Sequence, residues 1–307
     1  MKKRLYRIGL LIGLSLLLGA PSFAQDKIRV VASFSILGDM VQQVGGEAVD
    51  LTVLVGPNED AHVYRPTPRV VRQIQQSDLI VLNGLGYEGW FPRLMQSSGY
   101  QGGVVTVTDG ITPLHGGHEH GHHDDGDEEE PEHDINPHAW HSLPNAAVYV
   151  TNIEQALSEI RPEKASDFHQ RAEQYRSELK ALDQQVKLAL SHSDLNKRVI
   201  STHDAFGYIT AEYGIEFLAP QGVSTEAEPS AKDVALLIRQ IKQADVKAVF
   251  IENITDNRLI EQISRETGVD VYGELYSDAL SDQGGNAATY LDMMRYNLTS
   301  LINALAQ

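Results

Sequence analysis

The chain repeats one pattern twice: short apolar, β-branched runs alternate with stretches that have helical periodicity. In the first half the runs lie at 28–34, 49–55, 79–82 and 104–107. In the second half they lie at 198–202, 215–218, 248–252 and 269–275. Strands that alternate with helices in this way predict a parallel sheet with helices on both faces. We therefore predict an α/β fold with two lobes, each built on a mainly parallel sheet.

An uninterrupted helical pattern separates the two halves. After Pro162, residues up to 191 contain neither glycine nor proline, and their apolar side chains form one helical stripe: Phe168, Tyr175, Leu179, Leu182 and Val186. At a rise of about 1.5 Å per residue, such a helix is a rod roughly 45 Å long. We predict one long, rigid backbone helix over 162–192 that joins an N-terminal lobe (25–161) to a C-terminal lobe (193–307).

The first 24 residues have the pattern of a secretory signal peptide. Basic residues precede the apolar stretch 8–20, and small residues follow at Ser22 and Ala24. The apolar stretch is shorter than the roughly 20 residues that a transmembrane helix needs. We predict cleavage after Ala24. Because the sequence contains no cysteine, we expect no disulfide and no lipid on an N-terminal cysteine. The sequence thus predicts a periplasmic protein without a direct membrane anchor.

The charge balance limits the classes of partner. The whole chain carries a net charge of −17, and removal of the basic leader makes the remainder more negative still. A nucleic-acid partner is disfavoured because phosphate binding requires a basic face. A negative surface attracts cations, which agrees with a metal-binding role.

A histidine- and acid-rich segment lies at 115–134, within the N-terminal lobe. It holds six histidines and nine acidic residues among four glycines, with no apolar periodicity. This composition is typical of a flexible surface loop, and its histidines are candidates for loose metal capture. The candidate auxiliary metal ligands of this loop are His115, His118, His120, His122, His123 and His133.

Four further candidate ligands follow predicted strands. His62 comes after the second strand and His138 after the fourth, whereas His203 and Asp278 follow the first and last strands of the second half. Ligands of open parallel sheets bind beyond the carboxyl ends of the strands. If the two lobes face each other there, these four side chains meet in one cleft.

Three neutral imidazoles and one carboxylate form a donor set that suits zinc. Zn²⁺ takes nitrogen and oxygen donors in a four-coordinate shell, whereas calcium and magnesium prefer oxygen alone. Manganese would be better served by more carboxylates. Asp278 has competitors as the fourth ligand, because Glu59 and Asp60 border His62. One Zn²⁺ is therefore the expected tightly bound ion, with further weak sites in the loop.

Four segments resemble the zinc- and manganese-specific solute-binding proteins of ABC importers, the cluster A-I or cluster 9 family. They are EDAHVYRPTP, NPHAWHSLPN, STHDAF and the stretch from ENITDNRLIEQ to LYSDAL. The resemblance covers essentially the whole mature chain. It implies two α/β lobes joined by a long helix, no enzymatic activity, and His62, His138, His203 and Asp278 as the metal ligands.

The resemblance also indicates the zinc-type branch. Manganese-specific members usually have glutamate at the third ligand position, where this chain has His203, and a histidine-rich loop before the second ligand is typical of zinc members. One departure is Asn136, where the family usually has aspartate. We interpret His141 as a surface residue or one that supports a ligand, and we expect Tyr64, Arg65 and Trp140 to shape the cleft.

The predicted function is a high-affinity receptor that captures Zn²⁺ in the periplasm and delivers it to an ABC importer. Its expected partners are the permease with its ATPase, and a periplasmic zinc chaperone is a further candidate; we expect a monomer. The alternatives are a manganese receptor of the same family, a periplasmic zinc buffer or metallochaperone, and a zinc hydrolase. A hydrolase would need an open coordination position and a general base.

Overall fold

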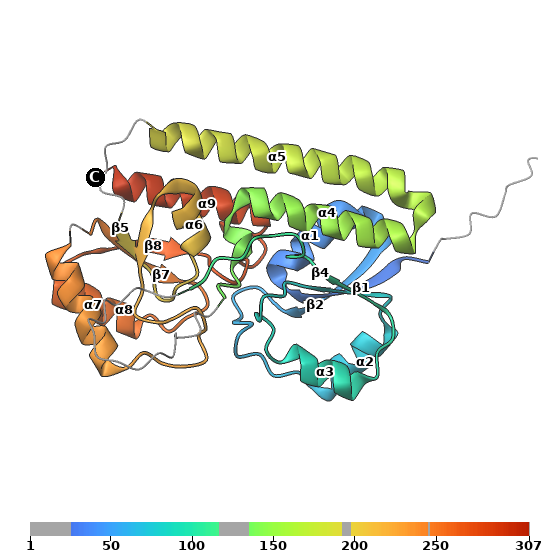
Figure 1. Cartoon of the computed structure of the whole chain (residues 1–307), viewed down its shortest axis with the longest axis horizontal. Helices are drawn as coiled ribbons and strands as arrows, with labels where there is room; N and C mark the ends of the chain where they lie inside the picture. Colours follow the sequence, from blue (N-terminus) through green and yellow to red (C-terminus); the bar gives the residue numbers. More distant parts are fainter. Residues whose placement is uncertain (1–25, 117–134, 192–197, 245, 307) are drawn as a thin grey trace, which may run out of the picture.

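Two four-stranded parallel sheets form the framework of the protein. The computed structural model describes residues 26–116, 135–191, 198–244 and 246–306 (Figure 1). The first sheet has the order β2-β1-β3-β4 and contains Ile28–Phe34 (β1), Val49–Val55 (β2), Leu79–Leu82 (β3) and Gly103–Thr106 (β4). The second has the order β6-β5-β7-β8 and contains Arg198–Ile200 (β5), Glu216–Leu218 (β6), Ala248–Glu252 (β7) and Val271–Leu275 (β8). The predicted fold class is confirmed.

Both sheets are covered by helices on their two faces. In the first, Pro68–Gln76 (α2) and Phe91–Ser98 (α3) lie on one side, and Ser35–Gly45 (α1) and Leu143–Ile160 (α4) on the other (Figure 1). In the second, Ala231–Gln243 (α7) and Arg258–Thr267 (α8) lie opposite Gly207–Tyr213 (α6) and Tyr290–Leu305 (α9). This coverage explains the continuous apolar runs, since a central strand such as β3 is buried at every residue.

The long helix is present and packs along both lobes. Residues Ala165–Ser191 form α5, and a 3₁₀ turn, Pro162–Lys164, leads into it. All five residues of the predicted apolar stripe are buried. On the α4 side, Glu154 pairs with His169 and Arg176 of α5, each at 2.8 Å. Figure 1 shows α5 running along α4 and α9, so the helix is the top layer of the molecule and not an isolated rod.

The two lobes are fixed to each other by direct contacts. One apolar core cluster contains residues of both, from β1 through α5 to α9. Several hydrogen bonds cross between the lobes. Examples, each 2.9 Å long, are Trp140 Nε1 to the carbonyl of Ser277, the Leu280 amide to Ser35 Oγ, and the Tyr290 amide to Asp39 Oδ2. A continuous core resists large hinge motion, because opening it would expose apolar surface to water.

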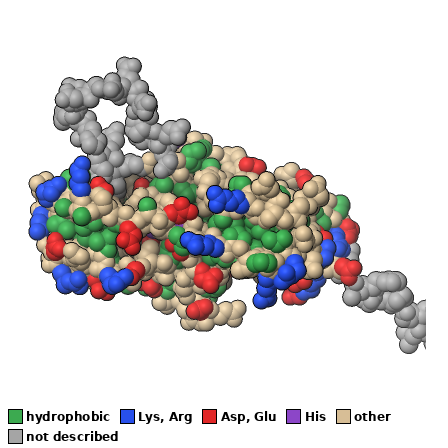
Figure 2. Space-filling view, turned by 90° about the horizontal axis from the view of Figure 1, so that it is seen from below, with side chains coloured by type: hydrophobic (Ala, Val, Ile, Leu, Met, Phe, Trp, Pro, Cys, Tyr) green, Lys and Arg blue, Asp and Glu red, His purple; other side chains and the backbone are tan. Residues whose placement is uncertain are grey.

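The exterior is charged and mixed. Figure 2 shows acidic and basic side chains interspersed on one face, with apolar side chains between them and no histidine in view. Within the described part of the chain, no helix combines the length and the apolar character needed to span a bilayer.

Candidate metal site

The four predicted ligands come from four loops at the carboxyl ends of strands. His62 lies in the loop between β2 and α2, and His138 lies just before the 3₁₀ turn Ala139–His141 that follows β4. In the other lobe, His203 follows β5 and Asp278 follows β8. Parallel strands place their carboxyl ends at the same edge of a sheet, and here the two edges face each other. Each lobe therefore supplies two donors.

The donor atoms of these residues form a compact group. The Nε2 atom of His138 lies 3.3 Å from that of His62 and 3.4 Å from that of His203. Asp278 Oδ2 lies 3.2 Å from His62 Nε2 and 3.4 Å from His203 Nε2, while Oδ1 lies 3.5 Å from His138 Nε2. All four ligand atoms lie within 4.8 Å of one another.

Burial sets the charge state of the group. Three of its members are fully buried, and His62 is 7% exposed. Burial lowers the pKa of His138 to about 4, although Asp278 partly opposes the shift, so this imidazole is neutral at pH 7. Burial also disfavours a charged His203, but Glu252 and Asp278 outweigh it and raise the pKa of His203 well above its usual value. The pKa of Asp278 is lowered well below its usual range, because His138 and His203 outweigh the effect of burial.

Two of the ligand imidazoles, those of His138 and His203, are held at Nδ1 by a neighbouring side chain. Glu252, at the end of β7, lies 2.6 Å from His203 Nδ1 and accepts hydrogen bonds from the amides of Thr202 and His203. Asn136 Oδ1 lies 2.8 Å from His138 Nδ1 and also accepts the His138 amide. A hydrogen bond at Nδ1 fixes the tautomer that leaves Nε2 free to coordinate. Both imidazoles are thus oriented for a cation before it arrives.

The loop of His62 is anchored across the lobes. Asp60 Oδ1 accepts the His62 amide at 2.9 Å, and Asp60 Oδ2 accepts the hydroxyl of Thr225 at 2.6 Å. The His62 ring packs edge-on against Tyr87, and the His138 ring packs against Trp140. These contacts limit the rotation of both rings.

The cluster has the properties of a cation site. Neither oxygen of Asp278 has a hydrogen-bond partner of good geometry within the described structure, although both are fully buried. A buried carboxylate without such partners is costly unless a positive charge faces it. In the metal-free protein that charge is the protonated His203, and a divalent cation at the centre of the four donors would replace it.

The other sequence candidates lie outside this group. Glu59 is exposed and accepts the Gly56 amide at 2.7 Å, so it is not a neighbour of His62 Nε2. Asp60 supports the His62 loop instead of joining the donors. His115 pairs with Ile135 in an isolated antiparallel bridge and lines a cavity beside His62. Five histidines lie outside the described residues: His118, His120, His122, His123 and His133.

The sequence left two interpretations of His141, a surface residue or one that supports a ligand, and its burial excludes the first. His141 is fully buried against Phe206, and burial lowers its pKa to about 3. Trp140 is also fully buried, so it packs beneath the site and does not line an open cleft, whereas Tyr64 and Arg65 do line one. Glu252 was not predicted. The reasoning that identified His203, that functional residues follow the carboxyl ends of parallel strands, could also have identified Glu252, because Glu252 is the last residue of the buried strand β7.

Comparison with known proteins decides the family. The family model described as "Zinc-uptake complex component A periplasmic" matches residues 30–304. The chain belongs to this family. It is 31% identical to the iron-binding protein YfeA of Yersinia pestis over 94% of this chain and 89% of that protein. It is 28% identical to the manganese ABC transporter substrate-binding lipoprotein PsaA of Streptococcus mitis, over 92% and 90%.

A solved structure supports the same family assignment. The periplasmic zinc-binding protein TroA of Treponema pallidum superposes with a TM-score of 0.82 and 30% identity, over 92% of this chain and all of that one. The chain is accordingly an extracytoplasmic metal-binding receptor of the kind that serves an ABC importer with its permease and ATPase. The named relatives bind different metals, so the metal must be argued from this chain's own donors.

Proposed function

We propose that this receptor captures Zn²⁺ in the periplasm and delivers it to the permease of its importer. The observation that supports the choice of metal is the set of donors gathered in one buried group: three imidazole nitrogens and one carboxylate oxygen, all within 4.8 Å of one another. Neighbouring ligand atoms of a tetrahedral shell with bonds of about 2.1 Å lie roughly 3.4 Å apart. Four of the six donor pairs among the Nε2 atoms and Asp278 Oδ2 measure 3.3, 3.4, 3.2 and 3.4 Å.

The type of donor supports the same ion. Three imidazoles and one carboxylate suit zinc, whereas manganese favours shells richer in oxygen. Non-haem Fe(II) sites commonly use two histidines and one carboxylate and keep positions open, while this cluster presents four buried protein donors. Relatives named for manganese and iron make those ions the alternatives to test.

The rival functions are less well supported. A hydrolytic zinc site leaves one coordination position for water, and four protein donors occupy all positions of a tetrahedral shell. A buffer would hold several ions with similar affinity, whereas the described residues provide one preorganised cluster. We propose a monomer that is released from its leader after Ala24 and reaches the permease by diffusion, with a periplasmic zinc chaperone as a further candidate partner. The intact mass of the exported protein tests the cleavage.

Replacing residues 117–134 by a short glycine-asparagine turn is expected to leave one tight zinc site. The ends of the replaced segment are already joined, because His115 and Ile135 form an antiparallel bridge. The cluster brings its four donors together within the described part of the chain, so it needs no ligand from the replaced segment. Calorimetric titration with Zn²⁺, with Mn²⁺ and with both in competition tests the stoichiometry and the choice of metal together. Loss of the tight site, or tighter binding of Mn²⁺, would contradict the proposal.

Zinc binding at pH 7 is expected to release about one proton. His203 carries a raised pKa and is protonated in the metal-free protein, and only its neutral form coordinates. His138, with its pKa near 4, is already neutral and contributes no proton. Below the raised pKa of His203 the apparent affinity therefore rises about tenfold per pH unit. Calorimetry in buffers of different ionisation enthalpy measures the number of protons released per zinc ion bound.

Glu252→Gln is the control for this measurement. The substitution removes the largest interaction that raises the pKa of His203, so proton release at pH 7 should fall. A binding enthalpy that does not depend on the buffer in the native protein would show that His203 is not protonated before the metal binds.

A further inference from the structure

The buried cluster can be reached from one side. His138, His203 and Asp278 are fully buried, and His62 alone among the four has exposed surface, 7% of its total. Two cavities meet at this histidine, with volumes of about 1220 and 910 Å³. A cation that enters the cluster without unfolding must therefore pass the His62 ring.

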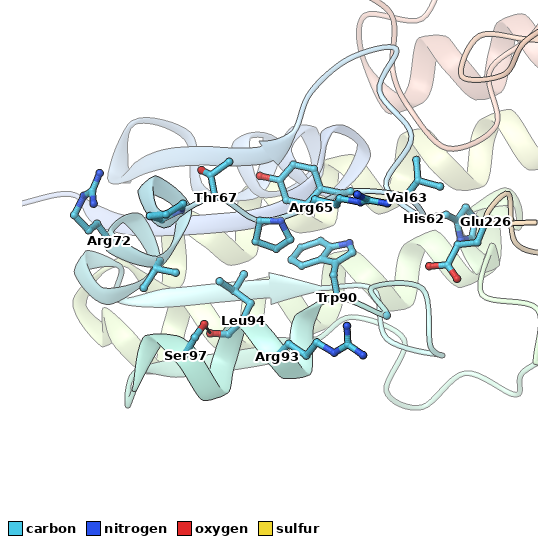
Figure 3. Close-up of a pocket in the computed structure, with 15 residues that line it drawn as sticks. His62, Val63, Arg65, Thr67, Arg72, Trp90, Arg93, Leu94, Ser97 and Glu226 are labelled. Carbon is cyan, nitrogen blue, oxygen red and sulfur yellow. Dashed lines mark hydrogen bonds between the residues drawn. The ribbon is translucent and has the colours of Figure 1, made fainter.

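One acidic side chain stands at this point of entry. The linings of the two cavities share His62, Gly89 and Glu226, and among the described residues Glu226 is the one acidic residue in either lining. Figure 3 shows Glu226 beside His62, with Arg65 and Arg93 on either side of Trp90 farther along the larger cavity. The arginines repel a cation, so Glu226 supplies the attractive charge at the mouth.

The position of Glu226 is fixed relative to His62. Its neighbour Thr225 donates to Asp60 Oδ2 at 2.6 Å, and Asp60 Oδ1 accepts the His62 amide. On the other side, Gln221 Nε2 donates to the carbonyl of Ala227 at 2.8 Å, which closes the loop around Glu226. The Glu226 carboxylate is exposed and makes no hydrogen bond or ion pair with a described residue. The backbone on either side of it is anchored, and the carboxylate is available to a cation.

We propose that Glu226 binds the incoming divalent cation first and passes it to His62. This inference rests on the proposed function and adds the route by which the ion enters. The carboxylate replaces one water of the hydrated ion, and His62 Nε2 then replaces a second as the ion moves inward. No bond within the protein is formed or broken. Glu226 is a capture residue, and it is not a member of the final four-donor shell.

The test is the association rate of Zn²⁺ alone with the metal-free full chain, followed by stopped-flow fluorescence, since Trp140 packs on His138. Glu226→Gln is expected to lower this rate about fivefold at low salt, with the difference shrinking as salt screens the charge. The dissociation constant should change less than twofold, because the same residue speeds entry and exit. Glu226→Asp should recover part of the rate.

Glu228→Gln is the matched control, because Glu228 is exposed on the same loop and lines neither cavity. It should bind zinc at the native rate. An unchanged association rate in Glu226→Gln would overturn the proposal, and so would a weaker affinity with an unchanged rate, which would place Glu226 in the final shell. Either result leaves the proposed function intact if one zinc is still bound tightly; absence of tight binding in the native chain would instead refute that function.

Discussion

Replacing His62, His138 or His203 by alanine is expected to weaken zinc binding by about 100- to 1000-fold. Structural zinc sites bind with roughly 10–16 kcal/mol, so one of four bonds represents about 3–4 kcal/mol, and each 1.4 kcal/mol is a factor of ten. Each substitution also leaves a polar cavity beside a buried carboxylate. Chelator competition on the protein in which 117–134 are replaced measures the effect without the five histidines of that segment.

His169→Ala is the matched control for this series. His169 is an exposed histidine of α5 that pairs with Glu154, away from the cluster. Its removal should leave the affinity for zinc unchanged. If His138→Ala binds zinc as tightly as the native cluster in the same background, the buried group is not the receptor site.

The structure changes the expectation for Asp278. From the sequence, water or Glu59 could take its place, and Asp278→Ala would then be the mildest substitution. In the structure Glu59 is exposed and bonded to the Gly56 amide, while Asp278 is fully buried among the imidazoles. We expect Asp278→Ala to weaken binding as much as loss of a histidine, because Asp278 is the one carboxylate of the described residues that joins the three Nε2 atoms in the cluster.

The alternating strands were predictable because their chemistry is local. Central strands such as β1 and β3 are buried on both faces, and this burial selects the β-branched runs visible in the sequence. The α5 stripe was equally clear, since Phe168 through Val186 fall on one face of a helix without interruption. The four donors were then identified because they follow strands, and a parallel sheet places the loops after its strands at one edge of the sheet.

Other features of the structure could not be predicted from the sequence because they depend on tertiary contacts. Helix α4 buries a broad face whose alanines and tyrosine carry little periodic contrast, although Ser142 does cap its first turn. The surface remained one of two alternatives for His141 because histidine is usually polar and exposed, whereas in the structure His141 is fully buried against Phe206. The role of Glu252 requires the neighbouring strands β5 and β7 to be paired, which the sequence alone does not show.

His203→Glu is expected to be a poor manganese switch by itself. In the native protein His203 Nδ1 lies 2.6 Å from Glu252 Oε2, and both side chains are fully buried. An introduced carboxylate would face Glu252, and two buried carboxylates in contact cannot both ionise. One must hold a proton, so the single variant should lose stability and weaken binding of every divalent metal. Thermal unfolding of the metal-free variant measures this loss.

Combining His203→Glu with Glu252→Gln is expected to restore the fold and to move the zinc-to-manganese affinity ratio by about 10- to 100-fold towards manganese. The amide of the glutamine can donate to the introduced carboxylate, and its oxygen can still accept the backbone amide of Thr202. The resulting shell has two imidazoles and two carboxylates, a harder donor set that favours manganese relative to zinc. Competition between Zn²⁺ and Mn²⁺ measures the ratio, with Glu252→Gln alone as the control that keeps three imidazoles. A double variant that folds but keeps the native ratio would show that the identity of the third donor does not set the choice of metal.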